Sequence, residues 1–249
     1  MIRIEKVCKS FAETPVLSDI NTTFDAGKCN LIIGQSGSGK TVLLKCVVGL
    51  HSITSGEIYY DDRVFSQMSK ASQKVLRQEM GMVFQGGALF DSMTVEQNIL
   101  FPLDMFTKMS KEEKGKRVDF CLERVNLNKA NKLFPAEISG GMRKRVAIAR
   151  AISLNPKYLF CDEPNSGLDP KTSIVIDNLI REITLDFNMT TIINTHDMNS
   201  VMEIGDNVVF IDGGTLAWEG NKKEVLSSDN KALSEFVFAS ELMKKIKTK

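Results

Sequence analysis

Hydrophobic and polar positions in the first fifty residues follow two different periods. Apolar residues at 2 and 4, and again within 20–24, alternate with polar ones, and a compact apolar run at 30–33 ends at Gly34. These patterns predict short strands, because successive side chains of a strand point to opposite faces of a sheet. After the glycine, apolar residues at 42, 43, 47 and 50 recur at helical spacing. Residues 30–50 therefore predict a strand, a glycine-rich loop and a helix.

The rest of the chain predicts an α/β fold that is interrupted by a helical insertion. Short strands are expected at 57–60 and 82–85, and the sequence between 95 and 154 is Met-rich, charged and helical in pattern. We expect this insertion to form a helical subdomain over about 87–155. A buried parallel strand at 158–161, a helix at 171–187, a strand at 190–194 and a hairpin over 208–219 complete the predicted sheet.

Residues 221–249 have a different composition from the predicted sheet. They carry seven lysines against four acidic residues. Two interpretations are open, an amphipathic helix or a loose solvated tail, and the charge excess favours the solvated tail. We therefore divide the chain into a domain at 1–220 and a C-terminal helical tail at 221–249.

Composition excludes several classes of protein. Of the 249 residues, 43% are hydrophobic and 25% are charged, which is typical of a globular chain. The 32 basic and 31 acidic residues leave a net charge of +1, too balanced for broad capture of nucleic acid. The chain has neither the apolar run of about 18 to 20 residues that spans a bilayer nor a secretory signal at its start. We expect a cytoplasmic protein.

The glycine-rich loop predicts a phosphate cradle. Its sequence GQSGSGKT matches the G-x-x-x-x-G-K-S/T pattern between a predicted strand and a predicted helix. Glycines let backbone N–H groups approach phosphate oxygens, and the helix adds its positive dipole end. The alternative is a glycine-rich helix start without a ligand. The loop consists of Gly34, Gln35, Ser36, Gly37, Ser38, Gly39, Lys40 and Thr41.

Within this cradle two side chains have predicted chemical roles. Lys40 would place its charge between the β- and γ-phosphates of a nucleotide, and the Thr41 hydroxyl would complete part of a Mg²⁺ shell. A second predicted strand, YLFCDE, ends in two carboxylates near the same sheet edge. Asp162 is the candidate Mg²⁺ ligand, and Glu163 is the candidate general base that polarises the attacking water. An exposed acidic strand end is the alternative for either residue alone.

Two further motifs identify a family. DEPNSGLD at 162–169 resembles the Walker B and D-loop run of ATP-binding cassette (ABC) ATPases, and SGGM at 139–142 resembles their signature. The resemblance covers about residues 1–220, with the motifs in family order. It implies a P-loop NTPase fold with a RecA-like core, an antiparallel β subdomain and an inserted α-helical subdomain. It also implies ATP hydrolysis coupled to transport, with ATP and Mg²⁺ as ligands.

The resemblance suggests roles for four more side chains. Phe11 resembles the aromatic residue that stacks on adenine, and Gln85 resembles the Q-loop glutamine that links the γ-phosphate and Mg²⁺ to the helical subdomain. His196 resembles the switch histidine that contacts the γ-phosphate, and Asp169 the D-loop aspartate that crosses a dimer interface. Considered singly, Phe11 is equally consistent with core packing, and the glutamine and histidine with ordinary satisfied polar groups.

The signature adds a second anion-binding helix end, formed by Ser139, Gly140 and Gly141. Two such ends for one nucleotide are explained if ATP is clamped between two copies of the chain, as the family does, so we expect a homodimer. Met142 departs from the family's usual glutamine. Because the clamping donors are mainly Ser139 and glycine amides, we expect ATP-dependent closure to survive.

A finer resemblance concerns the cargo. ISGGMRKRVAIAR at 138–150 and FQGGALFDSMTVEQNILFP at 84–102 resemble the MlaF-like ATPase of Mla/Mce-type phospholipid transport systems. That resemblance implies a position on the inner face of the cell membrane, an MlaE-like integral-membrane permease and accessory lipid-transport subunits. The permease would dock near 86–103, where the apolar candidates are Leu89, Phe90, Ile99 and Phe101.

Other functions remain open at this point. One is an ABC motor for another substrate, since the cassette does not contact the cargo. A second is a non-transport ABC ATPase that acts on nucleic acid or the ribosome, which the near-neutral charge disfavours. A third is a scaffold that binds ATP with little turnover, which the presence of Glu163 and His196 disfavours.

Overall fold

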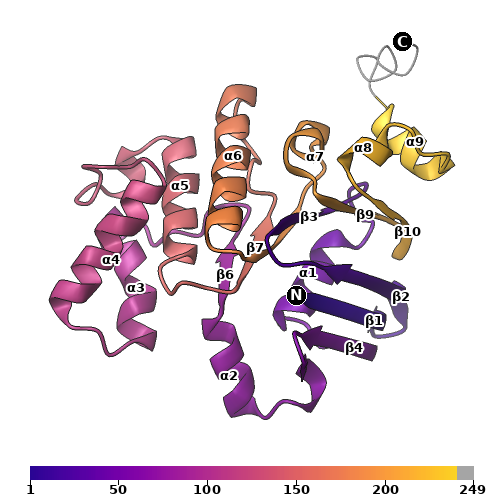
Figure 1. Ribbon diagram of the computed structural model, residues 1–249, viewed down its shortest axis with the longest axis horizontal. Helices are drawn as coiled ribbons and strands as arrows, with labels where there is room; N and C mark the ends of the chain where they lie inside the picture. The colour runs from indigo at the N-terminus through magenta and orange to yellow at the C-terminus, as the bar shows by residue number, and fades with distance from the viewer. Residues whose placement is uncertain (240–249) are drawn as a thin grey trace.

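Residues 1–239 are described by a computed structural model, and they contain two β-sheets with helices packed around them (Figure 1). The smaller sheet is antiparallel, with the strand order β2-β1-β4-β5. Its strands are β1 (Ile2–Phe11), β2 (Thr14–Phe24), β4 (Ser55–Tyr60) and β5 (Arg63–Val64).

The larger sheet has the strand order β10-β9-β3-β8-β7-β6. All neighbouring strands in it are parallel except the hairpin pair β9 and β10. Because ligands bind beyond the carboxyl ends of parallel strands, this order brings the segments that follow β3, β7 and β8 to one edge. The strands are β3 (Lys28–Ile33), β6 (Met80–Val83), β7 (Tyr158–Asp162), β8 (Thr190–Asn194), β9 (Asn207–Asp212) and β10 (Thr215–Gly220).

Most of the helices begin at a residue whose side chain caps them. Thr94, Ser110, Ser139 and Asp169 each accept a backbone N–H from the first turn of the helix that follows. Their helices are α3 (Val95–Phe106), α4 (Lys111–Arg124), α5 (Gly140–Ala151) and α6 (Pro170–Asp186). The others are α1 (Lys40–Val48), α2 (Lys70–Gln78), α7 (Met198–Ile204), α8 (Lys222–Val225) and α9 (Lys231–Val237).

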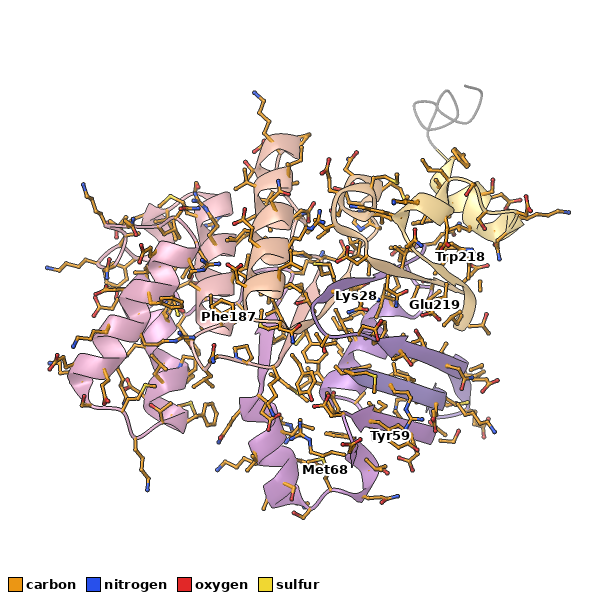
Figure 2. The ribbon with its side chains drawn as sticks, in the orientation of Figure 1. Lys28, Tyr59, Met68, Phe187, Trp218 and Glu219 are labelled. Carbon is orange, nitrogen blue, oxygen red and sulfur yellow. The ribbon has the colours of Figure 1, made fainter. Side chains whose placement is uncertain are left out.

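Strand alternation divides the apolar interior into two cores. In β3, Leu31 and Ile33 join a core with α3 to α7, whereas Ile32 joins a second core with α1 and the antiparallel sheet. Both faces of the larger sheet are therefore covered, which explains why its strands read as nearly continuous apolar runs. A hydrogen bond of 2.9 Å from Thr22 of β2 to Glu219 of β10, the residue labelled in Figure 2, connects the two sheets at one end.

Helices α3, α4 and α5 stand together at one side of the molecule (Figure 1). The ring of Phe187, just after α6, meets Phe120 of α4 edge to face, with centroids 6.2 Å apart (Figure 2). Arg124 of α4 also forms an ion pair with Asp186 of α6. These contacts attach the helical group to the α/β core. The predicted boundaries of 87–155 for this subdomain and of 1–220 for the whole domain remain predictions.

Most predicted elements are confirmed, including the strand, loop and helix over 30–50 and the hairpin over 208–219. The strand expected at 82–85 is displaced, because β6 ends at Val83. Helices α2 and α7 were not predicted, and Leu76 is the only buried residue of α2. Within residues 1–239, no helix combines the length and apolar character needed to cross a bilayer.

The preference for a solvated tail after residue 220 is wrong for its first half. Helices α8 and α9 place Val225, Leu233 and Val237 in the main core. Leu233 and Val237 are four residues apart and thus share one helical face, which provides the burial that offsets the cost of ordering the segment. Residues 240–249 lie outside the part that the structure describes.

Candidate functional site

The loop between β3 and α1 has a backbone that suits glycine. Gly34 has φ = 149° and Gly37 has φ = 81°, in the region that residues with a Cβ rarely adopt. A Cβ on Gly34 would also overlap the carbonyl oxygen of Ile211. A Cβ on Gly37 would point into open space, so the requirement for glycine there comes from the backbone angle alone.

The first turn of α1 is available to an anion. Its N-cap residue, Gly39, makes no side-chain hydrogen bond to the helix, so the amides at this end keep their donors. The Lys40 ammonium donates to the carbonyl oxygens of Gly34 (2.9 Å) and Gln35 (2.8 Å). An ammonium has three donors, so one remains for a ligand. Burial lowers the pKa of Lys40, while Glu163 and Asp162 oppose that change.

This loop forms one wall of a cavity of about 890 Å³. The cavity brings together ten predicted site residues, together with residues of α7 and α9 that were not predicted. The predicted residues that line it are Gly34, Gln35, Ser36, Gly37, Gly39, Lys40, Thr41, Gln85, Glu163 and His196. Ser38 is buried inside the loop, and its hydroxyl has no hydrogen-bond partner among the described residues.

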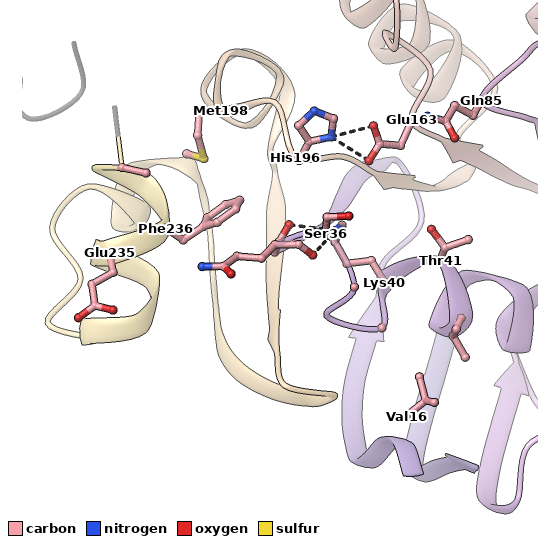
Figure 3. A pocket seen from close by; sticks show the side chains of 16 residues that line it. Val16, Ser36, Lys40, Thr41, Gln85, Glu163, His196, Met198, Glu235 and Phe236 are labelled. Carbon is pink, nitrogen blue, oxygen red and sulfur yellow. Dashed lines mark hydrogen bonds and ion pairs between the residues drawn. The ribbon is translucent and has the colours of Figure 1, made fainter. Parts of the chain in front are cut away.

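Glu163 and His196 form a close pair on the wall opposite the loop (Figure 3). Nδ1 of His196 lies 2.8 Å from Glu163 Oε1, and the side chains are 64% and 16% exposed respectively. Glu163 has φ = 49°, an uncommon conformation for a residue with a Cβ. Its backbone N–H donates to the carbonyl oxygen of Asn194 at 2.8 Å, which holds this turn in place.

Gln85 lies beside this pair and is connected to two other segments. Its Nε2 donates to Ser166 Oγ at 3.2 Å, and its backbone oxygen accepts a hydrogen bond from Lys144 of α5. Lys144 is buried, which lowers the pKa of its ammonium. This lysine was not predicted, although it links the signature helix directly to the segment after β6.

Two of the three residues expected to contact Mg²⁺, Thr41 and Asp162 but not Gln85, converge on an asparagine that was not selected from the sequence. The amide nitrogen of Asn194 donates to Thr41 Oγ1 (3.0 Å) and to Asp162 Oδ1 (2.6 Å). In residues 1–239, no group of three or more His, Cys, Asp or Glu side chains is arranged to hold a metal. One hydroxyl and one carboxylate fit Mg²⁺, which keeps several waters and takes its remaining ligands from phosphates.

The signature residues lie outside the cavity. Ser139 caps α5 by accepting the N–H of Met142 at 3.2 Å, and Gly141 packs so closely against Thr172 of α6 that a Cβ there would lie 2.7 Å from the Thr172 methyl. Asp169 caps α6 and likewise does not line the cavity. In a single chain, therefore, this second helix end does not meet the first.

Phe11 is also outside the cavity. It is 42% exposed at the end of β1, its ring meets His51 edge to face with centroids 5.3 Å apart, and Lys9 Nζ lies 4.6 Å from its centroid. The position is neither the core packing that was the alternative nor a cavity wall. A role in stacking on adenine remains a prediction.

Helix α9 supplies a wall that the sequence analysis missed. Glu235, Phe236 and Ala239 line the cavity, and Figure 3 shows Phe236 on the side away from Glu163 and His196. Phe236 also packs against Phe210 of β9, with centroids 5.4 Å apart. The apolar spacing of α9 was the available signal, and the lysine excess of the whole segment outweighed it.

Known proteins are similar in sequence to the segments that build this site. A family model described as ABC transporter matches residues 17–166. The chain belongs to the ABC transporter family. It is similar to the methionine import ATP-binding protein MetN of Clostridium tetani, with 35% identity over 98% of this chain and 76% of the relative. A probable ribonucleotide transport ATP-binding protein of Mycobacterium bovis is 36% identical over 95% of this chain and 66% of its own length.

A solved ABC structure supports the same conclusion. The dimeric, post-hydrolysis ATP-binding cassette MJ0796 bound to ADP and Pi has a TM-score of 0.80 and 30% identity, covering 89% of this chain and 99% of that one. The predicted P-loop NTPase fold is thus confirmed, and the chain is an ABC ATPase whose ATP hydrolysis is coupled to transport. Neither named relative is described as a phospholipid transporter, so these relatives do not support the finer resemblance.

Proposed function

We propose that the chain is the motor subunit of an ABC importer, in which two copies enclose ATP and drive an integral-membrane permease. The observation that carries the proposal is the cavity in which the Lys40 ammonium and the uncapped α1 end face the Glu163–His196 pair. The loop amides and Lys40 would hold the phosphates. Phe11 is proposed to reach the adenine.

The hydrolytic roles follow from the neighbours of each side chain. Glu163, held by His196 and by its own backbone bond, would take the proton from the attacking water. Gln85 would sense the γ-phosphate beside this pair, and its bond to Ser166 connects that position with the following loop. Thr41 and Asp162 would hold Mg²⁺, which supplies charge neutralisation at the phosphates when bound.

A second copy completes the site in this proposal. Ser139, Gly140 and Gly141 lie outside the cavity of their own chain, and the related cassette MJ0796 is dimeric with ADP and Pi bound. A two-fold pair would place the α5 end of each copy against the α1 end of the other. Asp169, exposed at the start of α6, would lie near that interface.

The permease is proposed to dock in a groove beside β6 and α3. A cavity of about 310 Å³ there is lined by Phe84, Phe90, Phe101 and Phe106, and three of these, all but Phe101, are among the exposed large apolar residues. Ile99 is fully buried and Leu89 packs against the core, so these two of the four apolar candidates are interior residues. The remaining aromatic surface fits an apolar helix of a membrane partner.

For the cargo, the relatives favour a substrate other than phospholipid. Their descriptions name methionine and ribonucleotide transport, and we propose a small polar solute, with methionine as the first candidate. Phospholipid remains the second candidate, because the segments at 84–102 and 138–150, including Met142, resemble Mla/Mce-type ATPases. An MlaE-like permease and accessory lipid subunits belong to this second candidate alone.

The proposal is tested by recovering the chain with its permease from membranes. We expect Phe90→Ser to reduce co-purification of an integral-membrane subunit, because it places a hydroxyl in the groove. Phe134→Ser is the matched control, since Phe134 is as exposed as Phe90, at 41%, and does not line the groove. Reconstituted complexes are then assayed for ATP-dependent uptake of methionine and for phospholipid transfer. Normal recovery of the permease with Phe90→Ser would refute the docking surface, and lipid transfer without solute uptake would refute the first cargo.

A further inference from the structure

Asn194 is the last residue of β8 and is fully buried. Its side-chain amide bonds to Thr41 Oγ1 on α1 and to Asp162 Oδ1 at the end of β7. Its backbone carbonyl accepts the N–H of Glu163. One residue therefore connects three predicted members of the hydrolytic site that come from different parts of the chain.

The chemistry of the partners decides how this amide is oriented. A carboxylate only accepts hydrogen bonds, so the NH₂ group, with its two donors, must face Asp162 and can also reach the Thr41 hydroxyl. The amide oxygen is left buried and without a partner among the described residues. Burying an amide on an apolar strand is unfavourable unless its bonds are made, so an orphan acceptor at this place needs an explanation.

We propose that Asn194 is a positioning residue that holds the Thr41 hydroxyl and the Asp162 carboxylate in place for Mg²⁺. This inference rests on the proposed function, because it assumes that these two oxygens serve the cation. A neutral amide suits the task, since it restrains the carboxylate without adding a second charge that would compete with it. The buried amide oxygen would gain the partner it lacks if a water of the Mg²⁺ shell entered beside it.

A matched asparagine allows the inference to be separated from a general role in the sheet. Asn30 on β3 is equally buried, and its amide nitrogen donates to the backbone oxygens of Asp25, Lys28 and Thr191. The Asn30 side chain makes four hydrogen bonds, against two for that of Asn194, and none of the four reaches a predicted ligand of Mg²⁺. Asn30→Leu therefore reports the cost of losing a buried amide without touching the metal site.

The experiment compares Asn194→Leu and Asn194→Ala with Asn30→Leu in the full chain. ATP binding is measured first in EDTA and then over a Mg²⁺ titration, and thermal unfolding of each variant is recorded. We expect both Asn194 variants to raise the half-saturating Mg²⁺ concentration roughly tenfold or more, the effect typical of lost partners of metal ligands. Their affinity for ATP in EDTA should stay within about twofold of the parent, because the loop amides and Lys40 are intact.

Three results would overturn the inference. They are an unchanged Mg²⁺ requirement in a folded Asn194 variant, an equal shift in Asn30→Leu, and an equal loss of ATP affinity in EDTA. Using Leu, which is close to Asn in size, and Ala, which is smaller, keeps the test valid if one of them does not fold. Lys40→Ala distinguishes a failure of the proposed function from a failure of the Asn194 inference. If Lys40→Ala binds ATP like the parent, the proposed function fails, regardless of the results for the Asn194 variants.

Discussion

The starts of α1 and α5 are both glycine-containing helix ends, but they differ in what their amides already bond. At α1 the N-cap Gly39 offers no side-chain acceptor, and the turn opens into the main cavity. At α5 the Ser139 hydroxyl accepts the N–H of Met142, and the turn packs against α6. The first end is open to a ligand of its own chain, whereas the second is already partly satisfied.

This difference indicates that the two helix ends have different roles. An anion should stabilise the end that lacks a cap more than the capped end, because its amides have no side-chain partner. Lys40, the first residue of α1, adds a buried positive charge there. The capped end keeps its geometry without a ligand, so in the proposed two-copy site it would be preorganised to meet a phosphate that the other copy presents. A chain on its own should therefore bind nucleotide through α1 and close onto a partner through α5.

Changing Glu163, the proposed base on the α1 side, should have the greatest effect on turnover. We expect Glu163→Gln to lower the ATPase rate by roughly 10² to 10⁴-fold with ATP binding retained, because glutamine keeps the shape but cannot take a proton. Glu235→Gln, which changes a carboxylate on the α9 wall of the same cavity, should leave the rate near that of the parent. Parent-like hydrolysis by Glu163→Gln would exclude a general-base role.

Removing the Lys40 charge at the start of α1 should weaken ATP binding itself. We expect Lys40→Ala to lower ATP affinity roughly 10- to 100-fold, the range for a lost hydrogen bond to a charged group. Lys45→Ala, in the last turn of the same helix, controls for the loss of a lysine from α1. Calorimetric titration of each variant measures the effect, and equal affinities for the two variants would contradict an anion site at this end.

Helix α6, against which the α5 end packs, carries a buried carboxylate, whereas α1 has no acidic residue. Burial raises the pKa of Asp177 on α6 to about 6, and Asp197 and Glu203 act in the same direction. The folded state thus favours the protonated form, so the free energy of unfolding should increase as pH falls from about 6 towards 4. In the parent, the gain in unfolding free energy over this pH range should be about 1 to 3 kcal/mol. Asp177→Asn should abolish the gain, which urea unfolding curves recorded at several pH values measure. A slope identical in parent and variant would be inconsistent with this pKa.

Removing the cap at α5 should affect pairing more than nucleotide binding. We expect Ser139→Ala to weaken ATP-dependent dimerisation roughly fivefold, the equivalent of about 1 kcal/mol for a lost cap. Sedimentation in the Glu163→Gln background prevents hydrolysis during the run. Ser110→Ala removes an equivalent cap from α4 and should leave dimerisation unchanged. Unaltered closure with Ser139→Ala would mean that this end is not shared between copies.

The two signature glycines should respond differently to a single methyl group. A Cβ on Gly140 would lie 3.8 Å from Leu168, an ordinary contact, but on Gly141 it would lie 2.7 Å from the Thr172 methyl. We therefore expect Gly141→Ala to lower the free energy of unfolding by about 1 kcal/mol through overpacking, with little change for Gly140→Ala. Thermal denaturation of the two variants as monomers checks this. Equal stabilities would show that the Thr172 side chain can move aside without destabilising the fold.

The contiguous parts of the site could be predicted from the sequence because their geometry is local. A strand, a glycine loop and a helix lie next to one another in the chain, and Asp162 ends a buried strand that Glu163 directly follows. Asn194 could not be selected in the same way. It ends a strand of the same type, but its partners are 153 and 32 residues away, and strand order alone brings them together.

The amino-acid sequence by itself determined the α/β class, the loop that suits phosphate and the family, since these depend on residue type and spacing along the chain. The tertiary structure decided which side chains meet: it joined Thr41 to Asp162 through Asn194 and placed Phe236 on a cavity wall. It also placed Phe11 outside that wall. Contacts between distant segments depend on strand order and packing, and neither is encoded in the period of any single segment.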